Sequence, residues 1–597
     1  MNTQTTTRLA DFRALLQEHG VAAAIVPQAD PHQGEYLAPH WQVRRWLSGF
    51  TGSAGDLVVT ANTAALWTDS RYFLQAGQQL EGSGIELMKD GIEGTPTIAE
   101  YLCSTLNAGD TVGLDGMLFT KAQTDALAEA LAAKGIKLIT DLDIIDTIWN
   151  DRPALPDGKI FVHEVKYAGE EAKDKIARIL ADAADKGCPA VFESMLDNIA
   201  WALNIRCNDV KHTPVATAFL YLSADKNVLF IDPAKLTDET TAYLASQGVG
   251  TLSYGEVKTF LGGLCQCKKV LVDAAHTAMQ LLTILGERAV DCGVSAAARF
   301  KSVKNDVQLK GVHEAMIRDG VAMVRSLMEI EQRVAAGVHT EETDIAEILR
   351  RHRAKGDLFF DESFGTIAGY AGHGAIVHYE ATEESSSTLK PEGLLLIDSG
   401  AQYLDGTTDI TRTIALGTPT TAEKTDFTLV MKGHIALAQA IFPAGTRGAQ
   451  LDALARQFLW KHGLSYLHGT GHGVGHFLSV HEGPHSIRLN NVEAPILPGS
   501  ITSNEPGLYR ENVHGIRCEN LVLCRKSTTT EFGDFLRFET LTLCPFDRSL
   551  FNLSMMTEDE IAWVDNYHAT VFARLSPALA TDDERAWLGA HTQPLKS

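Results

Sequence analysis

The pattern of hydrophobic and polar positions in the first half of the chain predicts two stretches built in the same order. Each stretch has an amphipathic helix, a glycine, a short apolar strand, a helix that carries tryptophan and a pair of strands. The first contains RLADFRALLQEHG and VAAAIV, and the second contains EEAKDKIARILADAADKG and PAVFES. Because the order recurs after about 150 to 160 residues, it predicts two related α/β domains, joined by the proline-punctuated segment NDRPALPDG.

A different pattern begins near Lys301. The segment VQLKGVHEAMIRDGVAMVRSLMEIEQRVAAG has apolar residues at helical spacing and ends on glycine. Strands rich in β-branched residues, mixed with helices, follow to about residue 545, and helical segments alternate with proline in the tail. We therefore expect an α/β and α+β multidomain chain whose four segments are 1–155, 156–305, 306–545 and a small helical appendage at 546–597.

Composition is that of an ordinary globular protein, with 45% hydrophobic and 21% charged residues. The formal net charge of −23 argues against a nucleic-acid partner, because phosphate binding needs a basic face. The polar amino terminus lacks the pattern of a signal peptide, and no apolar run of about 18 residues predicts a membrane span. These features favour a cytoplasmic protein with no membrane partner.

The nine cysteines are odd in number and widely spread, which does not predict a disulfide framework. Cys265 and Cys267 have the wrong spacing for a zinc knuckle. We expect reduced thiols in the protein core, as is usual in the cytoplasm.

Histidines gather in HGTGHGVGHFLSVHEGPH, which holds five of the 21 histidines within residues 468–485. Its last part, from His481 to His485, matches the H-E-x-x-H pattern of zinc proteases, but that pattern binds zinc only on a helix. Gly483 and Pro484 lie inside it, and proline clashes with the preceding helical turn. The run is also unlike a phosphate loop, and no G-x-S-x-G motif supports a serine hydrolase.

Acidic residues upstream offer partners for these histidines. In LLLIDSGAQYLDGTTDITRTIAL, an apolar strand leads to Asp398 and a second strand carries Asp409. A two-residue turn at Asp405-Gly406 would leave the two carboxylates about four residues out of line, so we expect a longer loop or a bulge there. On this stretch alone, two turn aspartates without a metal remain an alternative.

Two more acids lie downstream. Glu505 ends a strand just before Pro506-Gly507, and Glu519 lies within the predicted strand GIRCENLVLC. Arg517 is two residues before Glu519 and so points to the same face. An acid in an apolar strand is costly to bury unless it is paired or bound to metal, so a simple pair with Arg517 remains an alternative for Glu519.

Two aspartates, two glutamates and one or two histidines together suit two hard divalent ions. Four carboxylates balance the four positive charges of such ions. A water that bridges the ions would lose its proton easily and become a hydroxide nucleophile. Oxygen-rich ligation with one imidazole favours manganese, with cobalt, iron or zinc as alternatives.

The candidate ligands resemble, in type and in order along the chain, the metal ligands of the pita-bread metallopeptidases; they are Asp398, Asp409, His472, Glu505 and Glu519. HGTGHGVGHFLSVHE, with GAIVHY, DSGAQY, TDITRT, NEPGLY and GIRCEN, is similar to the proline-specific branch of aminopeptidase P and prolidase. The resemblance covers residues 310–545 closely and makes 306–545 the catalytic domain. The preceding segments and the tail look like those of the long, three-domain form of aminopeptidase P, with domains like that of creatinase at the amino terminus.

The resemblance implies a role for each matched residue. Asp398 would chelate one metal, Asp409 and Glu519 would bridge, and His472 and Glu505 would bind the other metal, with Glu505 also acting as the base. His378 and His481 would contact the scissile carbonyl, and His468 would line the proline pocket. His476 and His485 are interpreted either as structural or as residues that support the metal ligands from behind, and His373 matches no role.

The predicted function is release of the first residue from peptides whose second residue is proline, through a hydroxide that bridges two metals. Prolidase, which cleaves X-Pro dipeptides, is the nearest alternative. A non-catalytic binding or chaperone module is disfavoured, because the five ligand residues are all present. The resemblance also implies a homodimer. We expect peptides with an amino-terminal X-Pro sequence to be the substrates.

Overall fold

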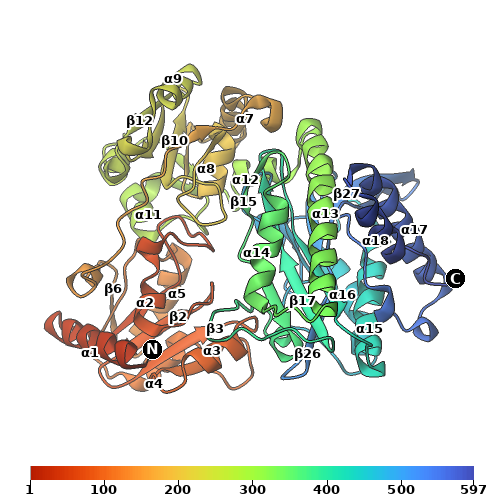
Figure 1. Cartoon of the computed structure of the whole chain (residues 1–597). Coiled ribbons are helices and arrows are strands. Elements are labelled where there is room, and N and C mark those ends of the chain that lie inside the picture. The colour runs from red at the N-terminus through yellow and green to blue at the C-terminus, as the bar shows by residue number, and fades with distance from the viewer. Residues whose placement is uncertain (1, 597) are drawn as a thin grey trace. The chain divides into compact units, whose positions relative to one another are not determined.

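Two six-stranded sheets with the same strand order organise the first of two compact units in the computed structural model, which describes residues 2–596 (Figure 1). This unit comprises residues 1–163 and 170–298. The first sheet has the order β4-β3-β2-β1-β5-β6. Its strands are β1 Ala23–Val26, β2 Asp56–Thr60, β3 Ala64–Thr68, β4 Glu86–Lys89, β5 Thr111–Gly113 and β6 Lys137–Ile139.

The second sheet repeats this arrangement, in the order β12-β11-β10-β8-β13-β14. Parallel and antiparallel pairings follow one another identically in both sheets. This confirms the repeated α/β architecture expected from the hydrophobic pattern. The strands are β8 Ala190–Glu193, β10 Ala218–Ser223, β11 Asn227–Ile231, β12 Val249–Leu252, β13 Val270–Val272 and β14 Ala289–Asp291.

Helices cover the faces of each sheet, because the central strands bury residues on both sides and read as continuous apolar runs. Ala64–Thr68 and Ala190–Glu193, for example, are buried along their whole length. The helices are α1 Asn2–Glu18, α2 Val43–Ser48, α3 Phe73–Gln79, α4 Ile98–Thr105 and α5 Lys121–Ala132 in the first half, and α7 Ala172–Asp185, α8 Leu196–Leu203, α9 Asp238–Ser246, α10 Val257–Gly262 and α11 Met279–Leu285 in the second.

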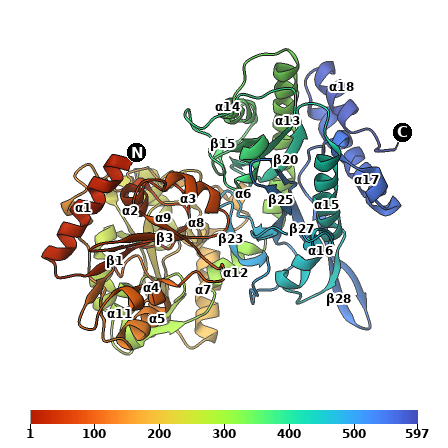
Figure 2. The same ribbon diagram turned by 90° about the horizontal axis from the view of Figure 1, so that it is seen from below.

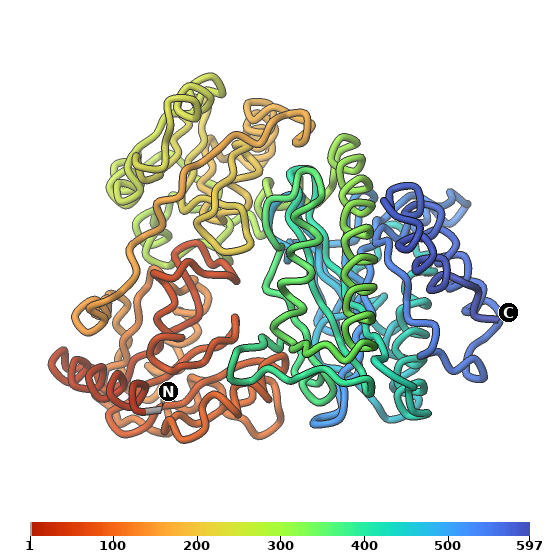
Figure 3. The backbone as a smooth tube through the Cα atoms, viewed as in Figure 1, coloured from red at the N-terminus to blue at the C-terminus, as the bar shows by residue number. Residues whose placement is uncertain are grey.

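The second unit comprises residues 164–169 and 299–597 and is built around curved antiparallel sheets with helices outside them (Figures 2 and 3). Its largest sheet has the order β21-β28-β27-β24-β22-β23. The strands of this sheet are β21 Ile441–Pro443, β22 Gly471–Gly473, β23 Glu482–Ile487, β24 Ile501–Asn504, β27 Asn520–Thr530 and β28 Gly533–Thr540. Three smaller sheets combine β15 Phe359–Glu362 with β18 Ala401–Tyr403 and β19 Gly406–Thr407, β16 Ile367–Tyr370 with β17 Leu394–Ser399 and β20 Ile410–Ala415, and β25 Gly507–Arg510 with β26 His514–Arg517.

The short helices α6 Val165–Ala168 and α12 Ala296–Ser302 lead into this unit, and the long helix predicted after Lys301 is α13, Asp306–Ala335. The predicted tail helices are also present, but they are more than an appendage. Val564 and Leu588 belong to the same buried cluster as Leu309 and Met316 of α13, so the tail completes the main core. The other helices are α14 Glu342–Arg353, α15 Thr421–Ala438, α16 Gly448–Trp460, α17 Glu558–Leu575 and α18 Asp582–His591.

The hairpin that carries the two aspartates differs from the expected one in its turn. We expected the turn at 405–406 and therefore a longer loop or a bulge. The observed strand pairing places Asp398 opposite Thr411, with a two-residue turn at 404–405. This shift of one residue leaves Asp409 only two positions from Thr411 on the same side of the hairpin, so the expected longer loop or bulge is wrong.

Two further expectations need correction. Glu519 does not lie within a strand but at the break between β26 and β27. Cys265 and Cys267 are exposed rather than in the core, and their sulfur atoms lie 2.7 Å apart. No helix within residues 2–596 combines the length and the apolar content that a membrane crossing requires.

Candidate metal centre

Side chains from four parts of the second unit form an acid–histidine cluster, which consists of Asp398, Asp409, His472, Glu505 and Glu519. Donor atoms of Asp409, His472 and Glu519 all lie within 4.8 Å of one another. His472 Nε2 is 3.4 Å from Asp409 Oδ2 and 3.5 Å from Glu505 Oε1. The structure therefore brings predicted ligands together that are separated by more than 100 positions in the sequence.

The β17–β20 hairpin fixes three of the acids. Asp398 lies in β17 opposite Thr411 of β20, and Asp409 directly precedes β20. Glu519 is held to the same hairpin, because its backbone N–H donates to the Thr411 carbonyl at 3.1 Å and its Oε2 accepts from Thr411 Oγ1 at 2.7 Å. Thr411 thus positions the carboxylate of Glu519, a residue that the sequence pattern predicts in a separate strand.

Strands β22 and β24 supply the other two members. The backbone N–H of His472 donates to Ser503 Oγ at 2.9 Å, and Ser503 Oγ donates to Glu505 Oε1 at 3.2 Å. His472 Nδ1 lies 3.0 Å from the Gly473 carbonyl, so this nitrogen carries the proton and Nε2 faces the acids. A histidine whose Nδ1 donates to a carbonyl, with Nε2 directed toward carboxylates, has the usual orientation of a metal ligand.

Electrostatics distinguish this cluster from a set of ordinary ion pairs. Burial and neighbouring acids raise the pKa of Glu519 well above its usual value, and burial also raises the pKa of Asp398 and Glu505. Burial opposes protonation of His472, but the hydrogen bond to Asp409 and the charge of Glu505 raise its pKa to about 9. Mutual repulsion of this kind is what divalent cations neutralise.

The donor set fits two such ions. Four carboxylates and one imidazole are the ligands that hard divalent metals select. Among the described residues, Asp398 Oδ1 is buried without a hydrogen-bond partner, although Oδ2 of the same group accepts from Arg517 Nη2 at 2.6 Å. A buried carboxylate oxygen without a hydrogen-bond donor fits the role of a metal ligand.

The three histidines expected to contact substrate occupy different positions around the cluster. The ring of His481 stands edge-on to that of His472, with centroids 4.3 Å apart. His468 Nε2 lies 2.7 Å from Tyr509 Oη. His378 follows the short η6 helix, Ala371–Ala375, and is half-buried.

Arg517 connects these groups and is almost fully buried. Besides Asp398, it donates to Tyr509 Oη at 2.7 Å, to Thr411 Oγ1 at 3.3 Å and to the Val377 carbonyl at 3.3 Å. Its ion pair is with Asp398 and not with Glu519, so the simple Glu519–Arg517 pair considered from the sequence is not the arrangement of the structure. Tyr509 was missed by the sequence analysis, although it links His468 to Arg517.

The remaining histidines of the region serve the fold. His485 is buried, and its Nε2 lies 3.0 Å from Thr502 Oγ1. His476 is buried as well, and His373 forms an ion pair with Glu342 at 2.9 Å. The HEGPH segment forms strand β23 rather than a helix, in agreement with its exclusion as a zinc-protease motif.

A second feature missed in the sequence lies beside this strand. Glu482 is buried and forms ion pairs with Lys304 and, at 3.1 Å, with Lys301. Two lysines just before α13 thus neutralise an acid inside the histidine-rich segment. The spacing of these lysines, K-S-V-K, is visible in the sequence, but it does not identify an acid about 180 residues away as their partner.

Comparison with known families agrees with this geometry. Residues 310–526 match metallopeptidase family M24, and residues 534–595 match the C-terminal region of the same peptidases. Residues 8–148 and 151–308 each match the Creatinase/Prolidase N-terminal domain. The two matches at the amino terminus correspond to the two sheets of identical topology.

Relatives with known names match nearly the whole chain. A probable Xaa-Pro aminopeptidase P of Neosartorya fischeri is 42% identical over 99% of this chain and 93% of its own length. Aminopeptidase P2 of Arabidopsis thaliana is 40% identical over 98% of this chain and 88% of its own. The crystal structure of an X-prolyl aminopeptidase from Caenorhabditis elegans, described as a cytosolic enzyme with a di-nuclear active site, superposes with a TM-score of 0.95 at 33% identity and covers 99% of both chains.

Proposed function

Since the chain belongs to metallopeptidase family M24 and is related over its full length to the Xaa-Pro aminopeptidases P, we propose that it is an X-Pro aminopeptidase. It releases the amino-terminal residue from peptides whose second residue is proline. The observation that carries this proposal is the buried acid–histidine cluster, where three donors lie within 4.8 Å, in a chain that matches such enzymes end to end.

The proposed ligands are Asp398, Asp409, His472, Glu505 and Glu519, with manganese as the preferred metal. Two ions bound there would lower the pKa of a water to make a nucleophile and would polarise the scissile carbonyl. Asp409 and Glu519 would bridge the two ions, as the family resemblance implies, and their shared proximity to His472 supports this proposal. Glu505 is the proposed base, because Ser503 holds its Oε1 while the carboxylate faces His472.

The surrounding residues bind and orient the peptide. We assign His481 and His378 to the carbonyl oxygen, where an imidazole N–H stabilises developing negative charge. His468, which is held by a hydrogen bond with Tyr509, lines the pocket for the proline ring. An X-Pro bond lacks the N–H that general peptidases bind, so a shaped pocket takes over that part of recognition. Arg517 holds Asp398 and Tyr509 in place from behind.

The assembly and location are also proposals. We infer a homodimer on the basis of the family resemblance, and a cytoplasmic location on the basis that the similar Caenorhabditis elegans X-prolyl aminopeptidase is described as a cytosolic enzyme. The division into segments 1–155, 156–305, 306–545 and 546–597 likewise remains a proposal, with the third segment carrying the metal centre.

Replacement of Asp409 by Ala tests the metal centre. The variant should retain well below two metals per chain and show background cleavage of Arg-Pro-Pro, because a lost bridge leaves both ions under-coordinated. Metal content by mass spectrometry and amino-acid release would be measured, with Glu539→Gln, an acid of the same unit outside the cluster, as control. Two retained metals with full activity would contradict the assignment.

Prolidase activity is the second candidate, and substrate length separates the two. With added Mn²⁺, the proposed enzyme should release arginine from Arg-Pro-Pro. Preference for Gly-Pro with no cleavage of the tripeptide would show a dipeptidase instead. Metal binding without cleavage of either peptide would show a binding module.

A further inference from the structure

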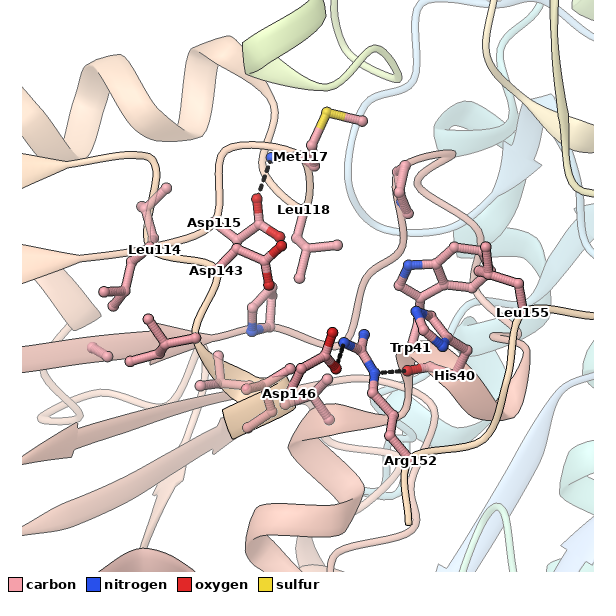
Figure 4. Close-up of a pocket in the computed structure, with 18 of the residues that line it drawn as sticks. His40, Trp41, Leu114, Asp115, Met117, Leu118, Asp143, Asp146, Arg152 and Leu155 are labelled. Carbon is pink, nitrogen blue, oxygen red and sulfur yellow. Dashed lines mark hydrogen bonds and ion pairs between the residues drawn. The ribbon is translucent and has the colours of Figure 1, made fainter. Parts of the chain in front are cut away.

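A cavity of about 310 Å³ lies within the first unit, and none of the residues that line it belongs to the acid–histidine cluster (Figure 4). Its walls come from both sheet regions, residues 1–155 and 170–298. Volumes of this size are typical of small-molecule sites. Most of the lining is apolar, and it includes Ile25, Trp41, Leu114, Leu118, Leu142 and Phe219.

The cavity occupies the usual ligand position of an α/β sheet. Strands β1, β5 and β6 are mutually parallel neighbours, and the residues that follow each of them line the cavity. In open α/β sheets, ligands bind in the crevice outside the carboxyl ends of the parallel strands. The position alone therefore marks this cavity as a binding site.

The walls are fixed relative to one another by hydrogen bonds between the two sheet regions. The Met279 N–H donates to the Phe119 carbonyl at 2.8 Å, and Thr120 pairs with Ala278 as a β-bridge. His32 contacts the Ser194 carbonyl at 2.8 Å through Nδ1. The cavity is thus preformed, and a ligand need not order it first.

Two carboxylates face each other at one end of the cavity. Figure 4 shows the side chains of Asp115 and Asp143 turned toward one another, on the loops that follow β5 and β6. Asp115 accepts a hydrogen bond from the Met117 N–H at 2.9 Å, but among residues 2–596 neither carboxylate forms an ion pair. Burial, and then the charge of Asp143, raise the pKa of Asp115.

The cations that line the cavity do not balance this pair. Arg152 is engaged by Asp146 at 2.6 Å. Lys258 donates to Gln280 Oε1 at 2.8 Å and is the one remaining positive charge of the lining. Asp115 is half-buried and Asp143 is exposed, and together with Asp146 these acids outnumber the two cations of the lining by one negative charge.

The repeated sheet supplies an internal comparison. Asp273 follows β13 as Asp115 follows β5, and its Oδ1 accepts from the N–H two residues on, Ala275, in the same type of turn. Three residues after Asp273, His276 contributes Nδ1 to its other oxygen at 3.0 Å. The first copy has Leu118 at that position, so the hydrogen-bonding imidazole that the second copy places beside its aspartate is missing from the first.

From this asymmetry we propose that the cavity binds a small organic cation, a primary amine with an apolar body, whose ammonium group lies between Asp115 and Asp143. The apolar walls bind the body of the ligand, and the ammonium takes the place that His276 occupies in the other copy. The proposal does not depend on the peptidase activity.

Titration calorimetry of the full chain with 2-phenylethylamine tests the site, with 2-phenylethanol as the uncharged control. The amine should bind at one saturable site per chain and the alcohol should not. Asp115→Asn and Asp143→Asn should each weaken binding about tenfold to a hundredfold, since a hydrogen bond to a charged group is lost. Asp141→Asn, which removes an acid of the same loop outside the lining, should bind as the parent does.

Leu118→His provides the opposite test. This substitution copies His276 into the first sheet region, so the built-in imidazole should compete with the amine and abolish its binding. Equal binding of amine and alcohol, or amine binding that Asp115→Asn, Asp143→Asn and Leu118→His all leave unchanged, would overturn the proposal. Absence of any amine binding to the parent chain would overturn it as well.

Discussion

Among single residues, His481 best tests whether the histidine-rich segment contains residues that contact the substrate as well as a residue that binds metal. Its ring contacts His472 but is not among the donors of the acid–histidine cluster. His481→Ala should therefore keep both metals and lower turnover about a hundredfold to a thousandfold, the usual effect of losing an oxyanion donor. Steady-state kinetics and metal analysis of one preparation check this. Loss of metal in the variant would instead make His481 a ligand.

Cys265 and Cys267 should be the reactive thiols of the protein. Both are exposed, and the hydrogen bond between their sulfur atoms lowers the pKa of Cys265, which favours the nucleophilic thiolate. Because the same hydrogen bond raises the pKa of Cys267, a maleimide should modify Cys265 in a fast phase in the native protein. The double variant Cys265→Ser/Cys267→Ser should lose this fast phase, whereas Cys103→Ser should keep it. Fast labelling that survives in the double variant would contradict the assignment.

The role of a residue could be predicted from the sequence where burial of its side chain without a partner would cost free energy. Asp398 and Glu519 were noticed because carboxylates interrupt apolar strands, and both are buried in the structure. Tyr509 and Lys304 were not noticed, because a tyrosine or a lysine is unremarkable in sequence until its partner is known. Their roles depend on contacts between distant segments, which no local pattern contains.

At the level of elements, the packing of α15 on α16 depends on the absence of a side chain at Gly433. A Cβ there would lie well inside van der Waals contact with the Ala455 carbonyl oxygen. Gly433→Ala should lower the free energy of unfolding by about 1–3 kcal/mol, as overpacking does. In α18, Gly589→Ala meets only Phe572 at 3.5 Å and should gain up to about 1 kcal/mol of helix propensity. Thermal unfolding of both variants measures the contrast, and equal shifts would contradict it.

Element types followed from periodicity, but registers did not. The apolar run before Asp398 correctly predicted β17, and the long helical repeat predicted α13. The hairpin turn was misplaced by one residue, because Asp405-Gly406 is a strong turn signal in isolation. The tight packing of α13 against the hairpin competes with that signal: a Cβ on Gly311 would press on Asp405. Tertiary contact therefore decided the register.

For the molecule as a whole, two buried histidines predict sensitivity to acid. His434 Nε2 accepts from Asn520 at 3.3 Å, and His568 Nε2 accepts from the Phe546 N–H at 3.1 Å, so both rings are neutral. Burial, reinforced by Arg412, lowers the pKa of each to about 3. The unfolded chain takes up these protons near pH 6.5 and the folded chain does not.

Stability of the second unit should therefore fall as the pH drops from 6.5 toward 3, by about 1.4 kcal/mol per pH unit for each histidine. Urea unfolding at several pH values measures the slope. His568→Gln, whose amide oxygen can still accept from Phe546, should reduce the slope by one histidine's share. The exposed His462→Gln should leave it unchanged. An identical slope in all three proteins would refute this explanation.

The duplicated sheets show what could be predicted at this scale. Their common topology followed from a repeated order of elements, without any alignment of residues. The difference between the two copies could not be predicted from the sequence. His276 and Leu118 are recognised as equivalent positions only when the two turns are compared in the structure.

The crowded carboxylates of the acid–histidine cluster also bear on the lifetime of the protein in a cell. Four buried acids repel one another, and Arg517 is the permanent cation that lies against them. Ions that bind only the folded chain add RT ln(1 + [M]/Kd) to its stability. A cell short of the metal would therefore hold a population that opens more often and is degraded sooner, so metal supply would set the abundance of the enzyme as well as its activity.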